Sequence, residues 1–181
     1  GVLIEKSDII NIDVRKALNS LQIKDVHREH AGRYVMRATN ESGQAEASVI
    51  LDVDVAPFII TALPERIEVR EKDSAKLICE VGGVPVPSVI WSKKGEDLVC
   101  SKENRLEMIS DGLNNILMVD NAEGKDAGIY NILAQNRIGK CSSKTELVVL
   151  IEPRFVRKIK DTQVIEKKVT KLEAEIVGVP K

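Results

Sequence analysis

Two stretches of the chain alternate between apolar and polar side chains with a period of two. They cover residues 75–81 and 130–135, and each has one apolar exception on its polar face. This is the pattern of a β-strand with one face in a core and the other toward solvent. The positions predicted to face inward are Ala75, Leu77, Cys79, Val81, Tyr130, Ile132 and Ala134. No stretch has a clear helical period, so we expect at most one helical turn before each tyrosine.

Turn signals separate the predicted strands. Each is a pair of residues that contains glycine, which adopts turn conformations at little steric cost. The pairs are Gly82-Gly83, Lys94-Gly95, Asp111-Gly112, Glu123-Gly124 and Ile138-Gly139. Residues 21–23 and 117–119 form matching strands ahead of the two tyrosine segments. Short strands with turns at regular intervals predict an all-β sandwich.

The chain repeats itself with a period of about 95 residues. The segment that ends at Tyr34, His-Ala-Gly-Arg-Tyr, recurs as Asp-Ala-Gly-Ile-Tyr at Tyr130, which is 96 positions later. Pro57 and Pro153 are also 96 positions apart. The tripeptide Gly-Val-Pro at 83–85 recurs at 178–180, with a spacing of 95. Self-similarity at a fixed period indicates an array of one structural unit.

The repeat predicts three parts. Residues 1–54 are the C-terminal part of one domain, residues 55–151 are a complete domain, and residues 152–181 are the N-terminal part of a third. Taken alone, the outer parts would expose apolar side chains such as Met36 and Leu172 to water. We therefore expect the protein to continue on both sides and to complete these two domains.

Composition and charge narrow the function classes. Hydrophobic residues make up 43% of the chain, and the net charge of −1 gives no pull toward nucleic acid or an anionic membrane. The longest apolar runs are far shorter than the roughly 20 residues that span a bilayer. The three cysteines are odd in number and form no C-x-x-C pair, so a zinc or thioredoxin-like site has no support. Unpaired thiols in a reducing compartment are the favoured interpretation.

No set of residues in the sequence has the spacing of a catalytic or ligand-binding site. His27 and His30 lie in one turn with Glu29 between them, but no fourth metal ligand is visible. The carboxylates between 65 and 73 are spaced along one segment, so most face solvent. No G-x-S-x-G or phosphate-loop motif is present. A basic patch between 157 and 168 could meet acidic partners, although a solvated strand face is favoured. We predict no enzyme activity, no cofactor and no metal, and a kinase domain elsewhere in the parent protein stays open.

Several motifs together resemble an immunoglobulin domain of the intermediate set. They are Cys79 at the strand B position, Gly83-Val84-Pro85-Val86-Pro87 as the B–C turn, Trp91 on strand C, Asp126-Ala127-Gly128-Ile129-Tyr130 as the tyrosine corner, and Asn136-Arg137-Ile138-Gly139 as the F–G turn. The resemblance implies tandem Greek-key sandwiches and a tyrosine hydroxyl bonded to backbone a few residues upstream. It also implies that the structural core contains Cys79, Trp91, Leu117, Tyr130, Ile132, Tyr34 and Met36.

Departures from the family pattern concern the disulfide and one corner. The strand F cysteine should follow the corner tyrosine by two residues, where this chain has Met36 and Ile132. The third copy has Ala174 at its strand B cysteine position, so no copy can form the inter-sheet disulfide. His30 stands where the family usually has aspartate, and we expect the first corner to be less well supported.

Because it lacks these disulfides, the chain resembles the intracellular immunoglobulin arrays of giant muscle proteins such as titin, twitchin, projectin, stretchin and obscurin. That resemblance implies a cytoplasmic, sarcomeric scaffold that spaces or binds filaments, above all the thick filament, and bears passive load. Its implied partners are myosin or other sarcomeric proteins and neighbouring domains of the same chain, with no nucleic acid and no membrane. Short proline-containing connections at 54–57 and 151–153 would stiffen the array. The alternative is an extracellular adhesion or receptor segment, which the glycosylation sequon Asn40-Glu41-Ser42 favours.

Overall fold

The protein was analysed as a computed structural model that describes residues 2–15, 18–100 and 105–179. The chain divides into two compact units, Gly1–Val55 and Ala56–Lys181. Pro180, which belongs to the repeated Gly-Val-Pro tripeptide, lies outside the described residues.

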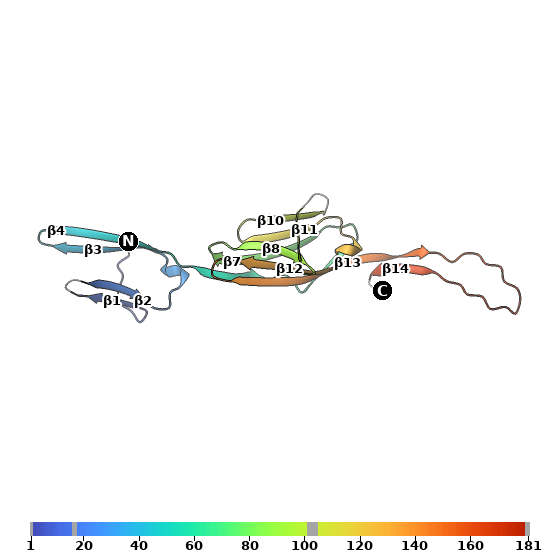
Figure 1. Cartoon of the computed structure of the whole chain (residues 1–181), viewed down its shortest axis with the longest axis horizontal. Helices are drawn as coiled ribbons and strands as arrows, with labels where there is room; N and C mark the ends of the chain where they lie inside the picture. Colours follow the sequence, from blue (N-terminus) through green and yellow to red (C-terminus); the bar gives the residue numbers. More distant parts are fainter. Residues whose placement is uncertain (1, 16–17, 101–104, 180–181) are drawn as a thin grey trace. The chain divides into compact units, whose positions relative to one another are not determined.

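The first unit consists of two antiparallel hairpins (Figure 1). The first hairpin joins β1 (Ile10–Val14) to β2 (Asn19–Ile23), and the second joins β3 (Gly32–Asn40) to β4 (Gly43–Leu51). Between the hairpins lies one 3₁₀ turn, η1 (Arg28–His30). None of the described residues of this unit is buried.

Met36 is therefore a correction to the predicted core, because the residue is 53% exposed. The first unit has only two two-stranded sheets, and this exposure is what the sequence predicted for residues 1–54 taken alone. Tyr34, on the same strand, is partly buried.

One sheet of the second unit has four strands in the order β10 (Leu106–Ser110), β11 (Asn114–Val119), β7 (Ala75–Val84) and β5 (Val55–Thr61). The β10–β11 and β11–β7 pairs are antiparallel. β7 buries Ala75, Leu77, Cys79 and Val81, which confirms the alternation predicted from the sequence.

The other sheet runs in the order β14 (Glu175–Val179), β13 (Lys140–Arg157), β12 (Gly128–Gln135), β8 (Ser88–Lys93) and β9 (Glu96–Asp97). β6 (Arg66–Arg70) pairs with β13 in parallel. The chain first enters this sheet at β6, returns to the first sheet at β7, and enters again at β8. It returns to the first sheet at β10 and crosses back at β12 after the 3₁₀ turn η3 (Gly124–Asp126) (Figure 1). The result is the predicted all-β sandwich, with single 3₁₀ turns before both tyrosines.

One core lies between these sheets. It contains Cys79, Trp91, Leu117, Tyr130 and Ile132, all of which are buried. Leu117 comes from the first sheet and faces Leu77 across the β11–β7 ladder. Ile132 comes from the second sheet, where its register partner is Trp91. Each sheet thus contributes its inward face to the same cluster.

The Gly82-Gly83 pair is not a turn, contrary to the prediction. Both glycines lie inside β7, which continues to Val84. The ring of Phe58 lies so close to Gly82 that a Cβ there would collide with it. Glycine is required at this position for close packing and not for chain reversal.

The strands of the two units correspond at the repeat spacing of 96. β1 to β4 occupy the positions of β10 to β13, and the end of β13 from Ile151 occupies that of β5. The predicted boundary between residues 151 and 152 falls inside β13, which runs for 18 residues without a loop. Its first half pairs with β12 and its second half with β14.

Candidate functional site

The tyrosine corner of the second unit closes on a single backbone atom. The hydroxyl of Tyr130 donates a hydrogen bond of 2.9 Å to the carbonyl oxygen of Asp126, as the family resemblance predicted. Tyr130 is 1% exposed, and burial raises its pKa to about 12. The carboxylate of Asp126 adds to this shift and the guanidinium of Arg105 opposes it. The hydroxyl therefore remains a protonated donor at neutral pH.

An ionic cluster supports this corner from outside. Asp126 Oδ2 accepts hydrogen bonds from the Glu123 amide at 2.8 Å and from Arg105 Nη2 at 2.9 Å. Arg105 also lies 3.4 Å from the Glu123 carboxylate, and it donates to the carbonyl oxygens of Asp120 and Asn121. The one guanidinium thus ties η3 to the turn before it.

The first unit retains the corner but not the ionic cluster. Tyr34 donates a hydrogen bond of 2.7 Å to the His30 carbonyl, and the His27 amide donates to His30 Nδ1 at 2.8 Å. The imidazole of His30 thus replaces the carboxylate of Asp126 as acceptor. The position 96 residues before Arg105 is Ile9, which brings no charge. The sequence predicted that the first corner would be less well supported because of His30. This corner lacks the ion pair of the second corner, but it keeps the hydrogen bond of the tyrosine hydroxyl.

The paired histidines form no metal site with other residues. The rings of His27 and His30 have centroids 6.0 Å apart, and His27 Nε2 lies 3.2 Å from Asp25. Across residues 2–15, 18–100 and 105–179, no group of three or more His, Cys, Asp or Glu side chains is placed to hold a metal ion.

All three cysteines are free thiols. Cys79 is buried in β7, as predicted for the strand B position, and Cys141 lies partly buried on β13 of the opposite sheet. Burial raises the pKa of both thiols. Neither is activated as a nucleophile, because the thiolate is the reactive form. Cys100 is exposed.

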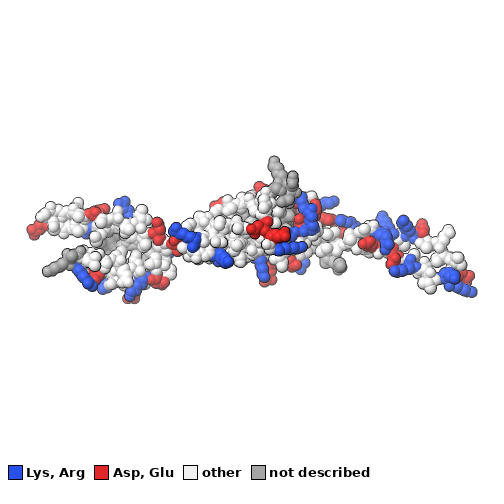
Figure 2. Space-filling view, in the orientation of Figure 1, with Lys and Arg blue, Asp and Glu red and all other residues white. Residues whose placement is uncertain are grey.

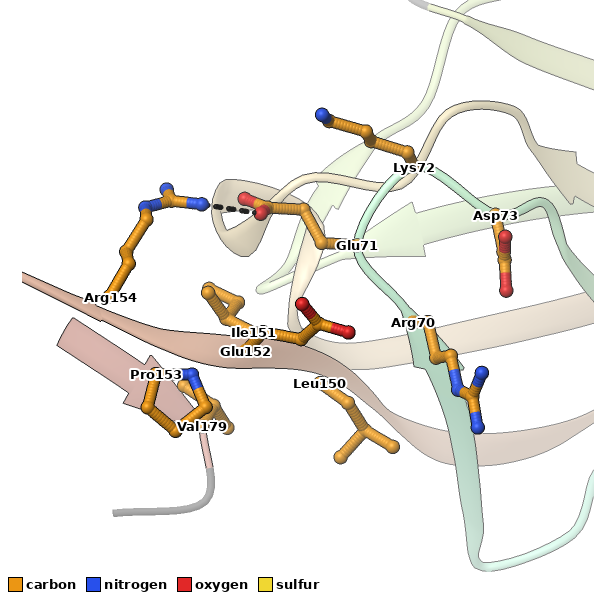
Figure 3. A pocket seen from close by; sticks show the side chains of 10 residues that line it. All are labelled: Arg70, Glu71, Lys72, Asp73, Leu150, Ile151, Glu152, Pro153, Arg154 and Val179. Carbon is orange, nitrogen blue, oxygen red and sulfur yellow. Dashed lines mark hydrogen bonds and ion pairs between the residues drawn. The ribbon is translucent and has the colours of Figure 1, made fainter.

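A groove of about 640 Å³ lies where β13 leaves the sandwich (Figure 3). Residues 70–73 form one wall, and residues 150–154 with Val179 form the other. Arg154 Nη1 crosses the groove to Glu71 Oε2 at 2.8 Å, and the Glu71 amide donates to the Leu150 carbonyl at 2.8 Å. Sequence reasoning placed most carboxylates of this segment in solvent and missed the pair, because 83 residues separate its members.

The basic patch of residues 157–168 lies among acidic side chains (Figure 2). Glu173 lies 3.9 Å from Arg157 and 2.5 Å from Lys171. These exposed pairs are typical of a solvated surface, as the sequence analysis favoured. The strand part of that interpretation is corrected, because all of the patch except Arg157 lies on the connection between β13 and β14.

The F–G turns are built on asparagine. Asn136 Oδ1 accepts hydrogen bonds from the amides of Ile138 and Gly139 at 2.9 and 3.2 Å, which confirms the predicted turn. Asn40 makes the equivalent bond to the Ser42 amide at 2.9 Å. The sequon asparagine is thus exposed at the tip of the β3–β4 hairpin.

Among the described residues, no helix has the length and apolar character needed to cross a bilayer.

The sequence is similar to segments of much longer proteins. Human hemicentin-1 is 36% identical over 164 residues, which are 88% of this chain and 3% of hemicentin-1. The muscle M-line assembly protein unc-89 of Caenorhabditis elegans is 29% identical over 166 residues, which are 89% of this chain and 2% of that protein. The chain thus spans only a few per cent of these relatives.

Solved structures of titin domains have the same fold. The titin fragment I67–I69, in an E-to-A mutated variant, aligns with a TM-score of 0.70 and 26% identity, and covers 98% of this chain and 62% of the fragment. A chain of the complex between titin M10 and an obscurin-like 1 immunoglobulin domain aligns with a TM-score of 0.50 and 31% identity, over 53% of this chain and 95% of that one. This fold is not an enzyme fold. The immunoglobulin I-set domain matches residues 1–53 and 58–149, so the chain belongs to the immunoglobulin I-set family.

Proposed function

We propose that this chain is a scaffolding segment of a giant sarcomeric protein, in which immunoglobulin domains space and bind muscle filaments and bear passive load. The observation that carries the proposal is β13, which leads without a loop from the last strand of the complete domain into the pairing with β14. A load-bearing joint needs this continuity, because a flexible linker would extend before the domains bore any force.

The strand pairing of the complete domain suits this load. β6, near the start of the domain, runs parallel to β13 with five register pairs from Glu146↔Arg66 to Leu150↔Arg70. A pull along β13 would slide these strands past each other, so their hydrogen bonds would have to break together. Separation of the strands one bond at a time would need a smaller force.

The joint at the end of the sandwich has restraints beyond the strand. The ion pair between Arg154 and Glu71 spans the groove, and Pro153 precedes Arg154 on β13. Proline fixes the backbone angle φ and so restricts bending. In this proposal, residues 1–54 are the last strands of one domain, 55–151 a complete domain and 152–181 the first strands of a third.

The proposed partners are sarcomeric proteins, with the thick filament and myosin first among them. Two comparisons support this: a relative named as a muscle M-line assembly protein, and a titin domain that was solved in complex with another immunoglobulin domain. The proposed location is the cytoplasmic sarcomere.

Localisation in muscle cells tests the proposal. Residues 1–181 fused to a fluorescent protein should form regular striations in cultured striated muscle cells. The matched control carries Trp91→Ala, which removes the buried core tryptophan and should make the fluorescence diffuse. Diffuse fluorescence of the unaltered chain, or accumulation at the cell surface, would overturn the sarcomeric assignment.

An extracellular adhesion or receptor segment is the second candidate. Asn40 of the sequon is exposed at a hairpin tip, as attachment of an oligosaccharide requires. The sarcomeric proposal also does not follow from every relative, because hemicentin-1 is 36% identical to this chain and its name does not refer to muscle. Secretion from mammalian cells, followed by enzymatic deglycosylation and intact mass measurement, tests this function. A mass loss that Asn40→Gln abolishes would support it, and an unmodified Asn40 would count against it.

A further inference from the structure

Apolar side chains cover the outer surface of the four-stranded sheet of the second unit. Ile109, Ile116 and Ile78 are direct neighbours across β10, β11 and β7, so they lie on one side of the sheet. Ile109 is 43% exposed and Ile78 is 41% exposed. On β5, Phe58 and Ile60 alternate with residues that face the core and extend the same surface. We call these five residues the isoleucine belt.

The fold itself does not require the belt, as the other copies of the repeat show. Ile109 and Ile116 correspond to Asp13 and Ser20, which lie 96 residues earlier and are also register partners. Phe58 corresponds to Arg154, which lies 96 residues later. These three positions are therefore polar in another copy of the repeat, whereas Ile60 corresponds to the apolar Val156, which lies 96 residues later. Contiguous exposed apolar surface that the fold does not need marks an interaction site.

The charges beside the belt favour a second copy of the same surface as its partner. Lys76 and Glu80 lie two residues before and two residues after Ile78, on the same face of β7. Consider two such sheets face to face, related by a twofold axis that lies between them and perpendicular to β7. Ile78 then faces its own copy, and Lys76 faces Glu80 of the other chain twice. One surface thus provides both its apolar centre and its complementary charges.

We propose that the isoleucine belt is a self-association surface, through which two copies of this chain pair face to face with their β7 strands antiparallel. The belt becomes the dry centre of the interface, and the two contacts between Lys76 and Glu80 fix the direction of the strands. The proposal rests on the second unit alone and is independent of the sarcomeric role. Its consequence is that two arrays that run in opposite directions would be cross-linked at this domain.

Analytical ultracentrifugation of residues 1–181 between about 1 and 100 µM, a range that brackets micromolar affinity, tests the proposal. We expect the unaltered chain to shift from monomer to dimer across this range, and Ile78→Lys to remain monomeric. The matched control is Ile90→Lys, which changes an equally exposed isoleucine (45%) on the outer face of the other sheet and should leave the dimer unchanged. Thermal unfolding of each variant verifies that the sandwich is folded.

Charge reversal tests the antiparallel geometry. Lys76→Glu and Glu80→Lys should each weaken the dimer at least tenfold, because like charges would then face each other. The double variant should recover most of the loss. Glu80 also accepts a hydrogen bond from Thr61 at 2.6 Å. This bond is kept in Lys76→Glu and is lost in Glu80→Lys and in the double variant alike, so its loss does not affect the comparison of Glu80→Lys with the double variant. A monomeric unaltered chain, a dimer that survives Ile78→Lys, an equal loss in Ile90→Lys, or no recovery in the double variant would overturn the proposal.

Discussion

Tyr34 and Tyr130 occupy equivalent places in two copies of one repeat, and both hydroxyls bond to the carbonyl oxygen four residues upstream. Around that bond the two regions differ. Tyr130 is buried in a two-sheet core and has Arg105 nearby, whereas Tyr34 is only partly buried and has Ile9 at the equivalent position. The comparison shows that a five-residue motif is enough to form the corner. The surrounding core decides how much that corner contributes to stability.

The core of the second unit should account for the largest difference between the two regions. Trp91→Ala should lower the free energy of unfolding of the sandwich by about 3–5 kcal/mol, because it leaves a large cavity. Circular dichroism during chemical denaturation measures this loss, and Trp91→Phe serves as a milder control. If the alanine variant unfolds at the same denaturant concentration as the unaltered chain, the corner owes little to this core.

The second largest difference should be the loss of folding stability at alkaline pH, which we expect to depend on Tyr130 and not on Tyr34. The folded-state pKa of Tyr130, about 12, exceeds the unfolded value of about 10. The resulting stability is therefore complete below pH 10 and is lost as pH rises toward 12, and the shift corresponds to roughly 2–3 kcal/mol. Thermal unfolding between pH 9 and pH 12 measures it.

The corresponding phenylalanine variants provide the controls. Tyr130→Phe should remove most of the steep alkaline loss, and Tyr34→Phe should leave it unchanged. An equal effect of both variants would mean that burial does not distinguish the two corners.

The ionic cluster should have a smaller effect. Arg105→Ala leaves the partly buried Asp126 carboxylate with one donor fewer, and should cost about 1–3 kcal/mol, as for hydrogen bonds to charged groups. In the first unit, Ile9→Arg alone should bring no gain, because His30 offers no carboxylate. The double variant Ile9→Arg with His30→Asp should slow amide hydrogen exchange around Tyr34. If Ile9→Arg alone slows exchange as much, the missing ion pair is not what separates the corners.

The smallest effect on the free energy of unfolding should come from the ion pair at the joint where β13 leaves the sandwich. The pair between Glu71 and Arg154 is partly exposed, so Glu71→Gln should cost only about 0.2–1 kcal/mol, and the cost should shrink at high salt. Unfolding at 20 mM and 500 mM salt, roughly 20 Å and 4 Å of screening length, measures this. A cost that is independent of salt would point to packing of the Glu71 side chain instead of its charge.

Local patterns in the sequence predicted much of this fold. Alternation identified the buried face of β7, and the repeated Ala-Gly-x-Tyr segment predicted both corners and their 3₁₀ turns. These features depend on residues close together in the chain. The same reasoning placed a turn at Gly82, because it could not know that Phe58 would pack there.

The candidate sites were harder to predict because they join distant residues. The whole of β11 lies between Arg105 and Asp126 in the sequence, and 83 positions separate Glu71 from Arg154. Met36 was assigned to a core by analogy with Ile132, but the first unit has only two two-stranded sheets and leaves Met36 53% exposed. An alternating pattern identifies the apolar face of a strand, but does not say whether another layer covers that face.

The uninterrupted course of β13 also limits how the length of the repeat can change. Leu147 and Val149 face the core because successive side chains alternate. Loss of one residue within this stretch would turn every following side chain to the opposite face. Only an even number of residues could be gained or lost without that inversion. The spacing between copies is 96 at Pro57 and Pro153 but 95 at Gly83 and Gly178, so the later copy is one residue shorter between Pro153 and Gly178. Much of that interval is the connection between β13 and β14, where no ladder would be inverted.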